Sequence, residues 1–214
     1  MTGDHLLDQF QLPKPQPDIY IVSKHAPVSI RDQIVRAVYL LERLWATKRL
    51  TAESRLLVVG AGACGVTAAI KAAHFGVKDV LLIEEKQEAL WLQASCTSRW
   101  VDPVQYDWPA FHWDGQVWPI DEPPGFPFPS ARKNPPPVPL NAGFADDWAG
   151  TFRKALANAE LNGEVRFLPD RKIVGYTRHK NFYAMKMLEV SSNMPAGHEF
   201  ATVFEEPPTG SGIG

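Results

Sequence analysis

Three glycines at a fixed spacing are the residues whose types most directly indicate chemistry. They stand in the segment GAGACG. The first permits a sharp turn out of a strand, the second lets backbone approach a pyrophosphate, and the third lets a helix pack tightly on the strand. The free N–H groups and the dipole of that helix would attract phosphate. The predicted cofactor-binding residues of this turn are Gly60, Ala61, Gly62, Ala63, Cys64 and Gly65.

An acidic residue follows where a dinucleotide-binding unit needs one. Glu84 lies roughly 20 residues after Gly65, and its carboxylate can accept hydrogen bonds from ribose hydroxyls. Because its negative charge would repel a 2′-phosphate, we expect this site not to hold the adenosine end of NADP. Glu85 comes directly after it, and we include it among the predicted cofactor-binding residues.

Strands and a helix are needed to position these residues. Residues 55–60 are an apolar run rich in branched side chains, which predicts a buried parallel strand. Residues 63–75 predict a helix that ends at Gly76, and residues 79–84 predict a second buried strand. A strand, a glycine turn, a helix and a strand within about 30 residues are typical of a βαβ unit.

The residues before this unit are predicted to form an N-terminal extension over 1–54. We expect a loose leader at 1–18, where alternating prolines disfavour helix, and a short strand at 19–22. Residues 29–49 predict an amphipathic helix in which Arg36 and Glu42 lie away from the apolar stripe. That stripe consists of Ile30, Ile34, Val38, Leu41 and Trp45.

The chain after the second strand changes in composition. The whole sequence has 19 prolines and 7 tryptophans, and many of them gather in an insertion at about 97–144. This insertion interrupts a dinucleotide-binding domain expected over 55–204. Residues 205–214 are expected to be a tail. Helices are predicted at 86–95 and 145–162, and strands at 164–168, 172–177, 182–190 and 199–204.

Charge and cysteine content limit the classes of partner. The formal net charge is −2, which provides no electrostatic case for binding nucleic acid or an anionic membrane. Two cysteines make neither a disulfide framework nor a zinc site, so we expect no metal and a reducing, cytoplasmic setting. The sequence begins without a secretory signal, and its apolar stretches are too short to span a bilayer.

The segment VVGAGACGVTAAIKAAHFGVKDVLLIEE resembles the FAD-binding motif of two-dinucleotide-binding-domain flavoproteins, which include glutathione-reductase-like enzymes and flavin monooxygenases. The resemblance is close over 55–85 and extends loosely to 145–204. It implies an α/β, Rossmann-like parallel sheet with an N-terminal helix, a long Pro/Trp-rich insertion and a C-terminal β-meander. It also implies that residues 165–168 are the third sheet strand.

The same resemblance implies a cofactor and further contacts. FAD would be the cofactor of an oxidoreductase, with NAD(P)H as a candidate electron donor and a small molecule of unknown identity as substrate. Ile173 and Val174 would run beside the adenine. Arg99 would contact the pyrophosphate or the flavin, or would instead pair with Asp102 or Asp107.

The sequence also departs from that family. No glycine pair follows Glu84, no closing strand ends in an alanine-threonine-glycine turn, and no second nucleotide domain follows. We therefore expect the flavin-binding part of a larger, split or truncated flavoenzyme, with a partner chain or a second copy completing the open sheet.

Other interpretations stay open. The chain would otherwise be a non-catalytic dinucleotide-binding or interaction module, a ubiquitin-activating-like adenylyltransferase, or a methyltransferase. Cys64 is either a reactive thiol at a helix N-terminus or a small filler of the turn. His112 is either a proton carrier or a packed loop residue, and no catalytic residue is assigned.

Overall fold

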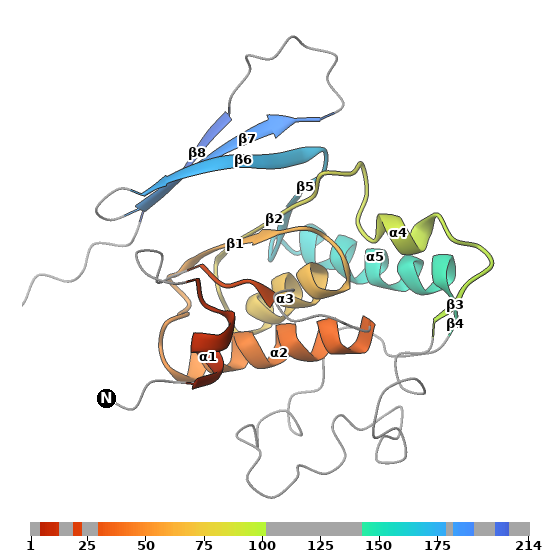
Figure 1. Ribbon diagram of the computed structural model, residues 1–214, viewed down its shortest axis with the longest axis horizontal. Coiled ribbons are helices and arrows are strands. Elements are labelled where there is room, and N and C mark those ends of the chain that lie inside the picture. The colour runs from red at the N-terminus through yellow and green to blue at the C-terminus, as the bar shows by residue number, and fades with distance from the viewer. Residues whose placement is uncertain are drawn as a thin grey trace, which may run out of the picture.

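The computed structural model describes residues 5–12, 19–22, 30–101, 143–178, 182–190 and 200–205, and a parallel three-stranded sheet lies at its centre (Figure 1). Its strands are β1 (Arg55–Val59), β2 (Asp79–Ile83) and β5 (Arg166–Leu168), in the order β1-β2-β5. Residues 166–168 pair with β2, so the predicted third strand of the sheet is confirmed. All three strands end at the same edge.

The predicted βαβ unit is present. Helix α3 (Ala63–His74) connects β1 to β2 and ends where predicted, with Gly76 at a φ of +85°. Side chains of β2 alternate between two buried clusters: Val80 and Leu82 face one, and Leu81 and Ile83 face the other. A strand that is buried on both faces needs an uninterrupted apolar sequence, which is the pattern that predicted it.

Helices cover one face of the sheet. Figure 1 shows α2 (Ile30–Ala46), α3 and α5 (Ala145–Leu161) together on that side. The predicted helices at 29–49 and 145–162 are thus confirmed. Helix α2 starts one residue later and ends three residues earlier than predicted, and α5 ends one residue earlier. Fully buried side chains of these helices include Ile34, Val38, Val66, Ala69 and Phe152.

A β-meander covers the opposite face. It consists of β6 (Arg171–Arg178), β7 (Phe182–Glu189) and β8 (Phe200–Glu205), paired antiparallel in that order. Met187 and Ile173 contact the sheet residues Leu81 and Ile83 in one hydrophobic cluster. The predicted meander is confirmed, and the fold has three layers: helices, parallel sheet and meander (Figure 1).

Two predictions for the N-terminal residues are wrong. Residues 5–10 form helix α1 (His5–Phe10) rather than a loose leader, because Leu7 and Phe10 are buried in the main core. Residues 19–22 do not form a strand; Tyr20 makes one isolated antiparallel bridge with Gln11. Burial of two apolar side chains offsets the low propensity of a helix this short.

Glu42, which the sequence places away from the apolar stripe of α2, is nonetheless buried. Its carboxylate lies 2.9 Å from the ammonium group of Lys71 in α3, and both side chains are 5% exposed. Trp45 stacks on Phe75 one turn further along, with ring centroids 5.0 Å apart. Helix α2 therefore packs side by side with α3 through polar as well as apolar contacts.

The segment after β2 is less helical than predicted. Helix α4 covers only Trp91–Ala94 of the expected 86–95. The predicted insertion begins and ends at a two-stranded antiparallel pair, β3 (Trp100–Val101) with β4 (Gly143–Phe144). The predicted proline-rich part of the insertion and the residues after Glu205 lie outside the described residues.

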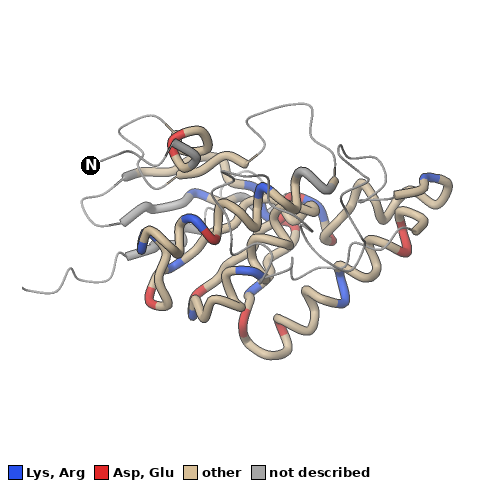
Figure 2. The backbone as a smooth tube through the Cα atoms, turned by 90° about the horizontal axis from the view of Figure 1, so that it is seen from below, with Lys and Arg blue, Asp and Glu red and all other residues tan. Residues whose placement is uncertain are grey.

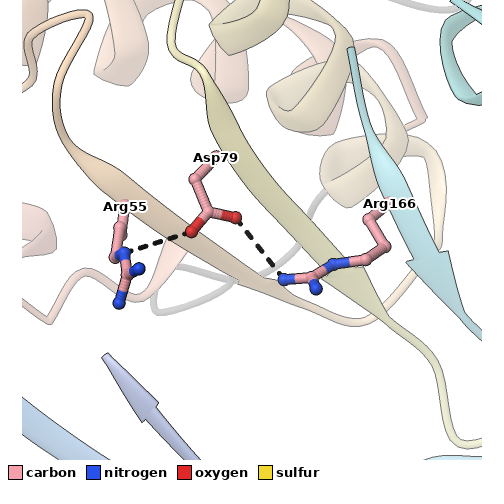
Figure 3. A network of polar contacts seen from close by, with 3 residues as sticks. All are labelled: Arg55, Asp79 and Arg166. Carbon is pink, nitrogen blue, oxygen red and sulfur yellow. Dashed lines mark hydrogen bonds and ion pairs between the residues drawn. The ribbon is translucent and has the colours of Figure 1, made fainter. Parts of the chain in front are cut away.

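Charged side chains join the three strands at the edge where they begin. Asp79 of β2 lies 3.2 Å from Arg55 of β1 and 3.5 Å from Arg166 of β5 (Figure 3). Elsewhere Lys and Arg are interspersed with Asp and Glu along the described backbone, in agreement with the small net charge (Figure 2). No helix of the described part combines the length and apolar character needed to cross a bilayer.

Candidate dinucleotide-binding site

The candidate site lies at the edge of the sheet where the parallel strands end. The glycine turn follows β1, and Glu84 follows β2 directly. Helix α3 starts at this edge because it leaves β1, and α5 starts here because it returns to the beginning of β5. Open α/β sheets bind their ligands outside the carboxyl ends of their strands, so the topology brings the predicted residues together at the expected place.

Gly60 and Gly65 are required by the fold itself. Gly60 has a φ of +93°, which favours glycine, and its N–H donates to the carbonyl of Ile83 at 2.8 Å. A Cβ at position 65 would lie 1.8 Å from the carbonyl oxygen of Gly60. The close approach predicted between helix and turn is therefore present, with backbone of the turn as the contact.

Gly62 differs from these two glycines. It is the N-cap of α3 with a φ of −76°, and a Cβ there would meet no protein atom within 4 Å. The fold alone does not demand glycine at this position. An α-helix leaves its first N–H groups without intrahelical acceptors, so open space beside Gly62 lies where a phosphate group would contact these donors.

The Ala61 peptide is fixed from both sides. Its N–H donates to Oε2 of Glu84 at 2.6 Å, and its carbonyl accepts from the N–H of Leu90 at 2.9 Å. The other oxygen of Glu84, Oε1, accepts from the N–H of Lys86 at 2.9 Å. Glu84, the residue predicted to bind ribose, thus connects the glycine turn to the segment that follows β2.

Neighbouring elements hold the segment from Glu84 to Leu90 in place. The N–H of Arg171 in β6 donates to the carbonyl of Glu84 at 2.7 Å. Glu85 lies 3.4 Å from Lys172 in an ion pair, and Glu88 is hydrogen-bonded to Arg153 of α5. Both glutamates therefore have protein partners that the sequence did not indicate.

Leu90 is in the left-handed helical conformation, with a φ of +57° and a ψ of +32°. This conformation is costly for a residue with a side chain. The Leu90 side chain is 1% exposed, and its burial in the main core compensates. The sequence lacks the glycine pair that flavoproteins often carry after the acidic residue, and here a leucine holds a conformation that glycine would adopt freely.

Cys64 is a partly buried filler of the turn that packs against the main core. Burial raises the pKa of its thiol from 9.0 to about 12, and the charge of Arg36 on α2 opposes this rise only in part. A thiol with so high a pKa is protonated at neutral pH, so the structure favours the second of the two roles left open for this residue. Arg36, which lies away from the apolar stripe of α2, thus acts electrostatically on Cys64 in the first turn of α3.

The residues predicted beside the adenine lie on β6. Ile173 is directed into the cluster between the parallel sheet and the meander, where it contacts Ile83 and Met187. Val174 is 44% exposed, and the pairing of β6 with β7 shifts register between Ile173 and Gly175. A bulge of this kind leaves backbone groups of Val174 outside the ladder, where a ligand can use them.

Arg99 lies between α4 and β3, and its side chain is exposed. Its carbonyl accepts from the N–H of Ala145 at the start of α5, at 2.8 Å. Its contact with a phosphate or flavin stays a prediction. Asp102, Asp107 and His112 lie outside the described residues.

The arrangement can bind and orient a nucleotide. The helix N-terminus, the space at Gly62 and the carboxylate of Glu84 have the chemistry that a pyrophosphate next to a ribose requires. Sequence reasoning missed Leu90, Lys86 and Arg36, because their roles depend on tertiary contacts. The absence of glycine after Glu84 was the one signal that pointed to Leu90.

Comparison with known proteins finds a distant similarity among solved structures. No protein-family model and no curated protein matches the sequence. Among solved structures, the chain is similar to THI4 of Thermovibrio ammonificans with 11% identity and a TM-score of 0.41, covering 81% of this chain and 62% of that one. The chain thus spans less than two thirds of that protein.

Proposed function

We propose that this protein binds FAD, with the ADP half of the cofactor at the glycine turn. The observation that carries the proposal is the open space at Gly62, beside the N-terminus of α3 and the carboxylate of Glu84. Glycine is present where the protein itself has no need of it. A pyrophosphate close to the backbone explains that choice.

The neighbouring elements support a specific orientation. The pyrophosphate would accept from the first N–H groups of α3, with Arg36 adding positive charge on the side of α2. Glu84 would accept from the ribose hydroxyls. The adenine would then lie along the start of β6, which is hydrogen-bonded to Glu84 and carries the bulge at Val174.

When bound, the flavin would supply the redox chemistry of an oxidoreductase, and the residues of this chain would hold and shield it. The test is to titrate the purified protein with FAD, NAD, ATP and S-adenosylmethionine side by side. Tightest binding of FAD supports the proposal. Tightest binding of ATP or S-adenosylmethionine would replace it with an adenylyltransferase or a methyltransferase.

A non-catalytic dinucleotide-binding module is the second candidate. Among the described residues, β1 stands at the end of the sheet with β2 as its only strand neighbour, and Val59 is 61% exposed. We propose that a partner chain or a second copy adds to this edge. FAD binding without reduction of the bound flavin by NADH or NADPH would favour this candidate.

A further inference from the structure

The N–H of Ala61 connects the glycine turn to Glu84. Ala61 is fully buried, so water does not compete for this donor. Its acceptor is the Glu84 carboxylate at 2.6 Å, and a hydrogen bond to an ionised acceptor is stronger than one between neutral groups. The carboxylate therefore fixes the plane of the peptide that precedes Gly62.

Glu84 is itself held in place. Its second oxygen accepts from the N–H of Lys86, so the carboxylate cannot turn away without losing two hydrogen bonds. On the other side of the Ala61 peptide, the N–H of Leu90 holds the carbonyl. The turn that leads into α3 is thus positioned by residues that follow β2.

We infer that Glu84 positions the phosphate-binding turn, in addition to any contact with ribose. The inference rests on the proposed function of the turn. The two roles are compatible, because each carboxylate oxygen has two acceptor positions and the backbone donors use one on each. Removal of Glu84 should then weaken the binding of a ligand that has no ribose.

Simple electrostatics predicts the opposite result. Loss of a negative charge beside an anion site should strengthen the binding of an anion. If Glu84 only contacted ribose, its removal should not weaken the binding of inorganic pyrophosphate at all. The direction of the change therefore separates a positioning role from a purely electrostatic or ribose-binding one.

Glu88 is a matched control. It carries the same charge in the segment that follows β2, and its carboxylate is paired with Arg153 of α5. Glu88→Ala removes the same charge from this segment without touching the hydrogen bond to Ala61. Glu84→Gln is the conservative variant, because one amide oxygen can still accept one of the two backbone N–H groups.

The experiment measures binding of inorganic pyrophosphate and of FAD to the full chain by calorimetry, for wild type and the three variants. We expect Glu84→Ala to weaken pyrophosphate binding by roughly tenfold, Glu84→Gln to weaken it less, and Glu88→Ala to leave it unchanged or tighter. Equal or tighter pyrophosphate binding by Glu84→Ala, with FAD still bound by wild type, would overturn the inference. Wild type that binds neither ligand would overturn the proposed function first.

Amide hydrogen exchange without ligand is the second measurement. The Ala61 amide should be protected in wild type and in Glu88→Ala, and should exchange at least tenfold faster in Glu84→Ala while the amides of β2 keep their protection. Unchanged protection of Ala61 in Glu84→Ala would contradict the positioning role. Loss of protection throughout β2 would show that the variant unfolds and that Glu84 supports the whole sheet instead.

Discussion

At the scale of single residues, the three glycines of the turn have different reasons to be glycine. Gly60 needs its positive φ, and Gly65 has no room for a Cβ. Gly62 has an ordinary φ and open space around it. All three positions could be found in the sequence from their spacing. Only the backbone angles and the surroundings of each Cβ position show which glycines the fold requires and which one a ligand would require.

Gly65→Ala is expected to destabilise the protein by about 3 kcal/mol or more, because the new methyl group would overlap the Gly60 carbonyl. This reverses the usual effect, since Gly→Ala inside a helix normally adds about 1 kcal/mol of stability. Urea unfolding of the variant measures the change. A Gly65→Ala protein as stable as wild type would mean that helix and turn are further apart than described.

Leu90 allows a test of backbone conformation. Both Leu90→Ala and Leu90→Gly lose core contacts, but only glycine adopts a φ of +57° without cost. We expect the glycine variant to be more stable than the alanine variant by about 1 kcal/mol, measured by urea unfolding. At most positions an alanine variant is more stable than a glycine variant. A more stable Leu90→Ala would therefore contradict the left-handed conformation.

Cys64 predicts a dependence of stability on alkaline pH. Above pH 9 the unfolded chain loses a thiol proton that the folded chain keeps up to its pKa of about 12. The unfolded state then binds fewer protons, so stability falls as pH rises through this range, by up to about 1.4 kcal/mol per pH unit. Below pH 9 both states hold the proton and the effect vanishes.

The measurement compares the free energy of unfolding of wild type and Cys64→Ala between pH 7 and 11. Their difference should be constant up to pH 9 and should then shift against wild type. The comparison cancels other groups that titrate in this range. A difference that stays constant to pH 11 would show that the thiol titrates normally in the folded protein.

At the scale of elements, helices α2 and α3 are joined by a buried ion pair. Glu42 and Lys71 are 2.9 Å apart, and the ammonium group of Lys71 also lies 4.9 Å from the centre of the Phe75 ring. Removal of one member leaves the other charge buried without compensation. The pair therefore fixes how α2 packs against α3, the helix that follows the glycine turn.

Lys71→Met alone is expected to destabilise the protein by about 3–5 kcal/mol, whereas Glu42→Leu combined with Lys71→Met should restore stability to near the wild-type value. Thermal and urea unfolding of the single and double variants test this. A double variant as unstable as the sum of both single variants would show that the two side chains do not act as a pair.

The elements differ in how well the sequence predicts them. The βαβ unit, α5 and the meander follow periodicity and glycine stops, and their bounds agree within a few residues. Helix α1 was missed because its six residues are stabilised by tertiary burial of Leu7 and Phe10 rather than by local propensity. Helix α4 was overestimated because the conformation of Leu90 interrupts it.

At the scale of the whole molecule, the three layers place every described part of the site at one edge. The turn after β1, the acid after β2 and the start of β6 meet there through Ile83, Ala61 and Arg171. The sequence indicates the residues of this edge but not their mutual contacts. Glu42, predicted to lie away from the apolar stripe of α2, is the clearest case, because periodicity cannot distinguish a buried charge with a partner from an exposed one.

The central claim is that the space at Gly62 receives the pyrophosphate of FAD. Gly62→Val fills that space, and the φ of −76° tolerates valine with only a loss of roughly 1 kcal/mol at the helix N-cap. The most direct test is to titrate FAD into wild type and into Gly62→Val, after circular dichroism and thermal unfolding have established that the variant is folded. We predict that wild type binds FAD and that the folded variant does not. Undiminished FAD affinity in Gly62→Val would contradict the proposed site.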